Sequence, residues 1–409
     1  MARGSVIVLS RITATRALSL ALFAVAFGTN VPTPLLLLYR TELDLSPTTL
    51  TLLFAFYAVG LVPTLFVAGP ASDRYGRKAV VVPFAVVSGL ASAVFLFASH
   101  SVLLLFIGRL LQGMVSGAVF SVGSAWMGEL ITDPGSAARR ATTALSMGFA
   151  LGPLTAGILG QYGPAPLELS YGVHLALVGL GLVMLRHVPE THVDRRADGP
   201  LINLGVPPSA RGAFLAFAVP VGLLVFTFPS VSLAVLPLRL QSAMPGRDLV
   251  ITGVIGGVTM VSGVLIQQVE KRLGPMVAAP VAAVAGAAGL VVGLISAALD
   301  APLLLLISAV LLGGGYGLSL AAGLTATQIL ASPASRGALV ATFYAVTYLG
   351  FGVPVILAAT SEGTDFDASL TVLACVTLVI AGVLWLGPGR RLLIAARGRG
   401  VPAQTTPPG

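Results

Sequence analysis

The sequence predicts an all-α membrane protein of twelve transmembrane helices in two six-helix bundles. The first observation is composition: mean hydropathy is +0.97, 56% of the 409 residues are apolar, and 9% are Asp, Glu, Lys or Arg, against about 25% charged residues in soluble domains. The second is that long uncharged stretches recur along the whole chain. The third is a polar segment that divides these stretches six and six. Such a chain is solvated by hydrocarbon rather than water.

The uncharged stretches are long enough to cross a bilayer. A hydrocarbon core of about 30 Å needs about 20 helical residues, and continuous apolar runs favour helices over the alternating strands of a barrel. The stretches are residues 17–39, 45–72, 79–99, 101–128 (interrupted by Arg109), 141–167, 169–185, 212–238, 249–269, 273–299, 301–335, 337–361 and 368–389. Ala24-Val25-Ala26 resembles a signal cleavage site. Because apolar residues continue to Leu38, we predict a membrane helix there instead.

The distribution of Lys and Arg predicts the orientation, since cytoplasmic loops carry an excess of both. With the N-terminus inside, 19 of the 23 basic residues fall in cytoplasmic segments. Three (Arg40, Arg239 and Arg247) fall in outer loops, and Arg109 lies in a span. We expect a multi-pass protein of the cell membrane with both termini cytoplasmic. Scattered basic residues and a net charge of +8 do not predict a nucleic-acid partner, and the lone Cys375 excludes a disulfide framework.

A polar segment at residues 186–211 divides the chain. The predicted parts are an N-terminal bundle over residues 1–190, a cytoplasmic linker over 191–211, a C-terminal bundle over 212–392 and a cytoplasmic tail over 393–409. The basic, proline-rich stretch from 390 onward favours disorder. Asp73-Arg74-Tyr75-Gly76 and Lys271-Arg272-Leu273-Gly274 lie 198 residues apart. This weak repeat indicates two homologous halves with a binding site between them.

A charged motif lies in the predicted cytoplasmic turn between the second and third spans. Residues 69–78, Gly-Pro-Ala-Ser-Asp-Arg-Tyr-Gly-Arg-Lys, resemble the G-x-x-x-D-R-x-G-R-[RK] loop of the major facilitator superfamily. The gating residues that the resemblance implies are Gly69, Asp73, Arg74, Gly76, Arg77 and Lys78, with Glu129 at the end of the fourth span.

Each motif residue has a physical role. Gly69 permits close helix approach and Gly76 a tight turn. If the halves close on the cytoplasmic side, we expect Asp73 at the N-terminal end of the eleventh helix, near Ser335. We expect Arg77 to meet Glu129. The alternative is that these charges only enforce orientation.

The fourth span contains a buried arginine. Leu105-x-x-x-Arg109-x-x-Gln112-Gly113 looks like the helix-4 arginine motif of the same superfamily. An intramembrane charge is a functional candidate because its burial is costly without a partner. Arg109 either attracts an anionic or electron-rich group of the substrate, or it bonds helix-1 carbonyls and fixes packing. Gln112 and Asn30 are its expected neighbours.

The fifth span contains a glycine motif. Residues 148–157, Gly-Phe-Ala-Leu-Gly-Pro-Leu-Thr-Ala-Gly, are similar to the G-x-x-x-G-P-x-x-G-G motif seen mainly in antiporter branches, with Ala156 replacing one glycine. Its small face allows close helix approach and Pro153 bends the helix. The motif residues are Gly148, Gly152, Pro153 and Gly157, and the expected partners on the eighth span are Gly253, Gly256, Gly257 and Gly263. The resemblance is to the drug/proton antiporter branch.

The resemblance assigns the central cavity to helices 1, 4, 7 and 10. The lining residues it implies are Phe23, Phe27, Asn30, Arg109, Gln112, Phe226, Phe228, Tyr316 and Ser319. A mostly apolar and aromatic lining suits amphipathic molecules more than sugars; for each Phe, core or lipid packing is the alternative. The acidic residues all lie in loops or at helix ends, so the residues do not show the proton coupling that the resemblance implies. His174 is the candidate proton site, or else a hydrogen-bonded structural residue.

The sequence therefore predicts a secondary active transporter that exports small amphipathic compounds, as in drug or metabolite efflux and multidrug resistance, by alternating access. We expect a monomer in the lipid bilayer that uses no cofactor or metal. The alternatives are an uptake permease for a small metabolite and a non-transporting receptor. An enzyme is not expected, because the sequence pairs no catalytic groups at membrane depth.

Overall fold

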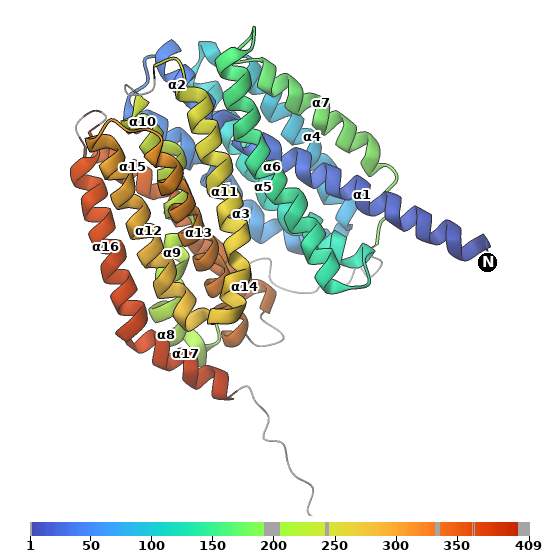
Figure 1. Ribbon diagram of the computed structural model, residues 1–409. Helices are drawn as coiled ribbons and strands as arrows, with labels where there is room; N and C mark the ends of the chain where they lie inside the picture. The colour runs from blue at the N-terminus through green and yellow to red at the C-terminus, as the bar shows by residue number, and fades with distance from the viewer. Residues whose placement is uncertain are drawn as a thin grey trace, which may run out of the picture.

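The computed structural model describes residues 2–191, 205–241, 245–331, 336–361, 363 and 365–399. Nearly all of these residues are helical (Figure 1). Within this part of the chain, eleven helices are long and apolar enough to cross a membrane. The seventeen-residue α7 (Leu169–Leu185) lies in the position of the predicted sixth span. The prediction of an all-α membrane protein is confirmed.

The first six spans form the N-terminal half. The other helices of this half are α1 (Ala2–Asn30), α2 (Pro32–Glu42), α3 (Pro47–Tyr75), α4 (Arg77–Leu96), α5 (Val102–Leu130) and α6 (Pro134–Tyr162). Together α1 and α2 make the first span, which is interrupted at Val31 because Pro32 and Pro34 supply no backbone N–H. At the centre, α5 packs against α1, α3, α4 and α6. Its side chains therefore reach most of the interior of this half.

The last six spans form the C-terminal half. Its helices are α8 (Arg211–Ala213), α9 (Val219–Ser230), α10 (Leu236–Arg239), α11 (Asp248–Leu273), α12 (Pro275–Ala298), α13 (Leu304–Leu330), α14 (Arg336–Tyr348), α15 (Val353–Ala359), α16 (Asp367–Leu386) and α17 (Pro388–Arg399). Two π-helical segments, Phe214–Ala218 and Val231–Val235, interrupt the seventh span, and a 3₁₀ segment, Leu349–Gly352, interrupts the eleventh. Interruptions of this kind often mark functional hinges.

The two ends of the molecule are named from the chain. The inner end carries the turn between α3 and α4, and the charge distribution predicts that it is cytoplasmic. The outer end carries the turns between α2 and α3 and between α6 and α7. Figure 1 shows α6 beside α11 where the halves meet, with the two helices separating toward the inner end.

The C-terminal stretch corrects one expectation. Disorder was expected from residue 390 onward, but Pro388–Arg399 form α17. The helix forms because Leu393 is fully buried and α17 packs against α8, α13 and the π-helical segment Phe214–Ala218. Residues 400–409 of the predicted tail and residues 192–204 of the predicted linker lie outside the described residues.

Candidate functional site

The halves touch through glycines on α6 and α11. A Cβ on Gly157 would lie 2.5 Å from the carbonyl oxygen of Leu249, and one on Gly253 would lie 2.5 Å from that of Pro153. Gln161 Oε1 accepts a hydrogen bond from the Leu249 backbone N–H at 3.1 Å. These residues lie in the outer parts of both helices. Small side chains thus let the two halves approach closely at the outer end.

The rest of the helix-5 motif faces another helix. Cβ atoms on Gly148 and Gly152 would collide with the backbone of α1, at Phe23 and Phe27. The predicted pairing with the eighth span is therefore present at Pro153 and Gly157, while the first two glycines seat α6 on α1.

Two glycines of α11 also face α6. A Cβ on Gly256 would lie 3.3 Å from the Pro153 ring, and a Cβ on Gly257 would lie 3.3 Å from the Ala150 carbonyl oxygen. Gly263, expected on the same seam, instead faces the Tyr316 ring of α13.

Polar side chains also join the halves at the outer end. Arg40 of α2 donates from Nη1 to Gln241 Oε1 at 2.8 Å, and Gln241 Nε2 donates to Asp248 Oδ2 at 3.3 Å. Arg40 belongs to the N-terminal half, and the other two residues belong to the C-terminal half. Together with the α6–α11 seam, these bonds hold the outer ends of the halves together.

An aromatic cluster crosses from one half to the other. Phe54 and Tyr57 of α3 lie 5.4 and 5.7 Å, centroid to centroid, from Phe351 in the 3₁₀ segment of the eleventh span. Phe226 of α9 lies 5.0 Å from Phe351 and 4.7 Å from Tyr348. Sequence reasoning missed all of these except Phe226, because it took lining residues only from helices 1, 4, 7 and 10. The available signal was two aromatic pairs spaced three residues apart, which share a helix face.

A cavity of about 490 Å³ opens between the inner parts of α1 and α6. Its lining residues are Ser19, Leu20, Phe23, Arg139, Arg140, Thr143, Ala144 and Met147. Arg140 Nη1 donates to Thr15 Oγ1 at 3.2 Å, and Arg139 lies 3.7 Å from the exposed Asp133 carboxylate. Two guanidinium groups therefore lie beside an aromatic ring and aliphatic side chains. We call this the inner cavity.

The residues predicted to line a central cavity divide into two sets. The buried set is Phe27, Arg109, Gln112, Phe228 and Ser319, and the partly exposed set is Phe23, Asn30, Phe226 and Tyr316. Phe228 fills the space left by Gly286 and Gly315 in the C-terminal half. Ser319 Oγ is buried and bonds to no partner in the described part of the chain. Of the second set, Phe23 lines the inner cavity.

Arg109 is directed at backbone carbonyl groups. It is 2% exposed, and it donates to the carbonyl oxygens of Leu53 at 3.1 Å, Phe54 at 2.8 Å and Thr29 at 3.2 Å. A fourth bond, of 3.1 Å, goes to Gln112 Oε1. The guanidinium also lies 5.1 Å from the Tyr57 ring centroid. Four of the five N–H donors of an arginine are therefore used within the protein.

The observed neighbours of Arg109 agree only in part with the predicted ones. Gln112 is present, but the acceptors lie mainly on α3, and Asn30 is absent from the bonds just described. Gln112 Nε2 donates to the Gly28 carbonyl at 2.7 Å. The usual helical donor for that carbonyl, the N–H four residues later, is missing because residue 32 is a proline. The pair thus ties α1, α3 and α5 together.

His174 of α7 lies inside the N-terminal half. It is 1% exposed, its Nδ1 is 2.6 Å from Ser92 Oγ and its Nε2 is 3.5 Å from Ser88 Oγ. Its ring stacks on Phe27 with centroids 6.4 Å apart and occupies the space that a side chain at Gly28 would need. The imidazole is therefore a hydrogen-bonded packing element between α1, α4 and α7.

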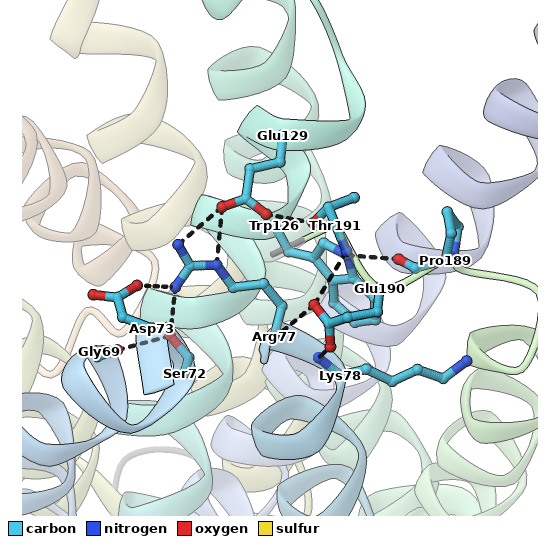
Figure 2. A network of polar contacts seen from close by, with 10 residues as sticks. All are labelled: Gly69, Ser72, Asp73, Arg77, Lys78, Trp126, Glu129, Pro189, Glu190 and Thr191. Carbon is cyan, nitrogen blue, oxygen red and sulfur yellow. Dashed lines mark hydrogen bonds and ion pairs between the residues drawn. The ribbon is translucent and has the colours of Figure 1, made fainter. Parts of the chain in front are cut away.

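Figure 2 shows the charged network at the inner end. Arg77 donates from Nε and Nη2 to Glu129 Oε1 at 3.0 and 2.9 Å. Its Nη1 donates to Asp73 Oδ1 and to Ser72 Oγ, both at 2.5 Å. Arg77 thus meets Glu129 as the motif predicts, and it joins the end of α3 to the end of α5.

A third acid completes this network. Glu190, which precedes the predicted linker, accepts from the backbone N–H of Arg77 at 3.0 Å and of Lys78 at 2.9 Å. It caps the N-terminus of α4, where unpaired N–H groups favour an anion. Thr191 Oγ1 donates to Glu129 Oε2, and Trp126 Nε1 donates to the Pro189 carbonyl at 3.1 Å. From the sequence, Pro189, Glu190 and Thr191 were recognised only as part of the polar segment at residues 186–211, with no contact predicted for them.

The remaining motif residues have distinct surroundings. Gly76 has φ of +106°, and a Cβ there would lie 2.5 Å from Glu190 Oε2. Lys78 Nζ donates to the Val188 carbonyl at 3.1 Å. Arg74 is exposed and lies 5.7 Å from the Tyr75 ring centroid. A Cβ on Gly69 would meet no atom within 4 Å, so the expected close helix approach at Gly69 is not present.

The expected contact of Asp73 with the eleventh helix is not among the described contacts. Asp73 pairs with Arg77 of its own half. Ser335, the expected cap, lies outside the described residues, and α14 begins at Arg336. The bonds drawn in Figure 2 join residues of the N-terminal half to one another and to Thr191, the first residue of the predicted linker.

The described residues form eleven helices of membrane-spanning length and the shorter α7. They make two halves that are bonded at the outer end and separate toward the inner end (Figure 1), which is the architecture of a membrane transporter. The chain belongs to the Major Facilitator Superfamily, whose profile it matches over residues 18–354. This confirms the resemblance drawn from the loop after the second span.

Three known proteins illustrate the relationship. The chain is similar to the bacillibactin exporter of Bacillus subtilis, 29% identical over 118 residues (28% of this chain and 29% of that protein). It is also similar to the triacylglyceride transporter of Mycobacteroides abscessus, 28% identical over 248 residues (59% and 46%). The chain thus spans less than half the length of these relatives. A crystal structure of a peptide transporter POT mutant with alafosfalin gives a TM-score of 0.77 at 14% identity, covering 91% of this chain and 93% of that one, which shows the fold.

Proposed function

We propose that this transporter is a secondary active exporter of small amphipathic compounds, and that it works by alternating access between its two halves. One observation carries the proposal. The halves are bonded at the outer end through Gly157, Gln161 and Arg40. At the inner end α6 and α11 separate (Figure 1), and a cavity of about 490 Å³ opens between α1 and α6, within the N-terminal half. A transporter in this state takes up cargo from the inner side, which the charge distribution predicts is the cytoplasm.

The chemistry of the inner cavity supports an amphipathic cargo. Arg139, Arg140 and Thr143 supply polar donors, while Phe23 and Met147 supply apolar surface. Binding sites for such molecules combine an apolar wall with a few placed polar groups. The two relatives named above, a bacillibactin exporter and a triacylglyceride transporter, agree with this cargo class. A cargo with one anionic group fits the two guanidinium groups best.

Arg109 fixes helix packing in this proposal and does not bind the substrate. Its donors are used on Leu53, Phe54 and Thr29, so a substrate anion would have to displace bonds between α1, α3 and α5. We assign it the role of holding these helices in place. The aromatic cluster around Phe351, which lies between the halves, is the better candidate for direct contact with the apolar part of a cargo.

The proposal includes export driven by proton entry, as in the drug/proton antiporter branch that the motifs resemble. Proton exchange requires a group that titrates during the cycle. His174 is kept as the candidate because, of the described histidines, it is the one buried inside the membrane-spanning part. For it to exchange a proton, α1 and α7 must separate during the cycle so that water reaches its ring. His174→Gln would then abolish proton-driven export while leaving exchange of cargo between the two sides intact.

Transport in inside-out membrane vesicles tests the proposal. Vesicles carrying the protein are energised with a proton gradient, and uptake of an anionic, a neutral and a cationic amphipathic dye is measured with and without a protonophore. We expect uptake of the anionic dye to be fastest and to stop with the protonophore. Uptake only into right-side-out vesicles would identify a permease instead, and binding without movement in either would identify a receptor.

Two variants assign the residues. Arg140→Gln should lower uptake of the anionic dye about tenfold, the effect of one lost charge-assisted contact, with Arg272→Gln, an exposed arginine at the same end, as the matched control. Arg109→Gln should instead reduce all three dyes equally and lower the melting temperature. A selective loss of the anionic dye in Arg109→Gln would show that this arginine binds cargo.

A further inference from the structure

A groove of about 450 Å³ runs between α12 and α16 on the lipid-facing surface. Its lining residues are all apolar: Pro280, Val281, Val284, Leu378, Ala381, Gly382, Trp385 and Leu386. A Cβ built on Gly382 would meet no atom within 4 Å, so the groove owes part of its depth to this glycine. From Leu378 to Leu386 the helix rises about 12 Å. The groove therefore extends from within the membrane to its inner interface.

The inner end of this groove is basic. Arg390 of α17 stacks on Trp385, with its guanidinium carbon 5.0 Å from the ring centroid. Among the described residues, its guanidinium donates one hydrogen bond, of 3.4 Å, to the Trp385 carbonyl, and its Nε is buried without a partner. It forms no ion pair with a described carboxylate. A cation held on an aromatic ring with donors unused is prepared for an anion.

The surroundings of Arg390 add to the positive charge. Arg391 and Arg397 are exposed on the same helix, and Arg211 is exposed on α8, which lies against Leu392 of α17. No acidic residue occurs in α17. Basic residues at a membrane surface attract anionic lipid headgroups. The charge and the apolar groove therefore meet at one place, Trp385 and Arg390.

We propose that this groove is a binding site for one anionic phospholipid, which places an acyl chain between α12 and α16 and its phosphate on Arg390. The acyl chain buries apolar surface that the groove offers, and the phosphate supplies the acceptors that Arg390 lacks. A zwitterionic lipid would fill the same groove with weaker headgroup binding, because its net charge is zero. The site is independent of cargo transport, since it lies on the outside of the C-terminal half.

Native mass spectrometry of the full-length protein tests the site. The protein is purified in detergent with an equimolar mixture of phosphatidylglycerol and phosphatidylcholine, and the lipids retained are counted. We expect wild type to retain phosphatidylglycerol selectively, and Arg390→Gln to lower that selectivity about fivefold, the effect of one basic residue near an anionic surface. Arg186→Gln, which removes an exposed arginine at the inner end of the other half, is the charge control and should leave the selectivity unchanged.

A second pair of variants tests the acyl-chain part. Gly382→Leu fills the groove and should abolish retention of the bound lipid, whereas Gly179→Leu, on the exposed surface of α7 where a Cβ also meets open space, should not. Unchanged selectivity in Arg390→Gln or unchanged retention in Gly382→Leu would overturn the proposal. So would displacement of the lipid by inorganic phosphate alone, or a dimer mass in wild type that becomes monomeric in Gly382→Leu, since the groove would then bind free anions or a second copy.

Discussion

The turn between α3 and α4 and the turn between α11 and α12 occupy equivalent places in the two halves. Each depends on a glycine with positive φ: Gly76 at +106° and Gly274 at +70°, with ψ of 155° and 161°. In the first, Arg77, Glu129 and Glu190 build a charged network around the turn (Figure 2). In the second, Lys271 and Arg272 are exposed and belong to no ion pair among the described residues.

The difference shows that the backbone turn can form without the charged network. The repeat supplies the glycine in both halves, because a helix that reverses direction so tightly needs a left-handed residue. The charged network also needs acidic residues that are distant in the sequence, here Glu129 and Glu190. In the C-terminal half α12 begins with Pro275, which has no N–H to be capped. Among the described residues no side chain caps α12, and Pro275 removes one of the N–H groups that such a cap would meet.

Removing the arginine from each turn should have the largest effect. Arg77→Ala removes the guanidinium group that Asp73 and Glu129 share. We expect the free energy of unfolding in detergent micelles to fall by about 3 kcal/mol, the upper end of the range for lost bonds to charged groups. Arg272→Ala should change the free energy of unfolding by less than about 0.5 kcal/mol, as for an ordinary surface residue. Equal effects in chemical denaturation would remove the distinction between the turns.

Alanine at the two glycines separates backbone strain from side-chain collision. Gly274 has φ of +70° and ψ of 161°, a backbone conformation that is essentially restricted to glycine. Gly274→Ala should therefore cost about 1 kcal/mol from backbone strain alone, because a Cβ there meets open space. Gly76→Ala carries the same strain and also pushes Glu190 away from α4, so we expect about 1 kcal/mol more. The double variant Gly76→Ala/Glu190→Ala sharpens the comparison. If a Cβ at residue 76 collides with Glu190, the double variant should lose less stability in thermal melts than the two single variants together.

The cap alone should have the smallest effect. Glu190→Ala removes the acceptor for the backbone N–H groups of Arg77 and Lys78, and a lost cap costs about 1 kcal/mol. Glu190→Gln keeps an acceptor oxygen but loses the charge at the helix N-terminus, so about half of that loss is expected. Hydrogen exchange at the first turn of α4 measures the effect. In Glu190→Ala we expect the amide hydrogens in the first turn of α4 to exchange faster, while those in the first turn of α12 exchange at the wild-type rate. An unchanged exchange rate in α4 would rule out the capping role.

Much of the fold could be predicted because each span is determined by its own residues. Uncharged runs of helical length predict spans one by one, since lipid supplies no hydrogen bonds to the backbone. The first span and α7 show the limits: prolines divide the first into α1 and α2, and α7 has only seventeen residues. The disorder expected for the tail was wrong, because α17 gains its stability from burying Leu393 against another segment.

Local motifs predicted the site less completely. The contact between Arg77 and Glu129 followed from a motif and from the shared inner end of two spans. Glu190 could not be recognised, since a polar residue in a connector looks the same whether it is solvated or capping a distant helix. The aromatic cluster around Phe351 was missed for a similar reason: its members come from α3, α9 and the eleventh span, and only packing brings them together.

By itself the sequence determined that this protein lies in a membrane, how many times it crosses, and where its sharp inner turn occurs, because these depend on hydropathy and on glycine over short distances. The tertiary structure decided which donors found which acceptors. Arg109 donates to carbonyl groups of α1 and α3 because a buried guanidinium must bond to the acceptors that the neighbouring helices present. No local sequence pattern specifies which helices those are.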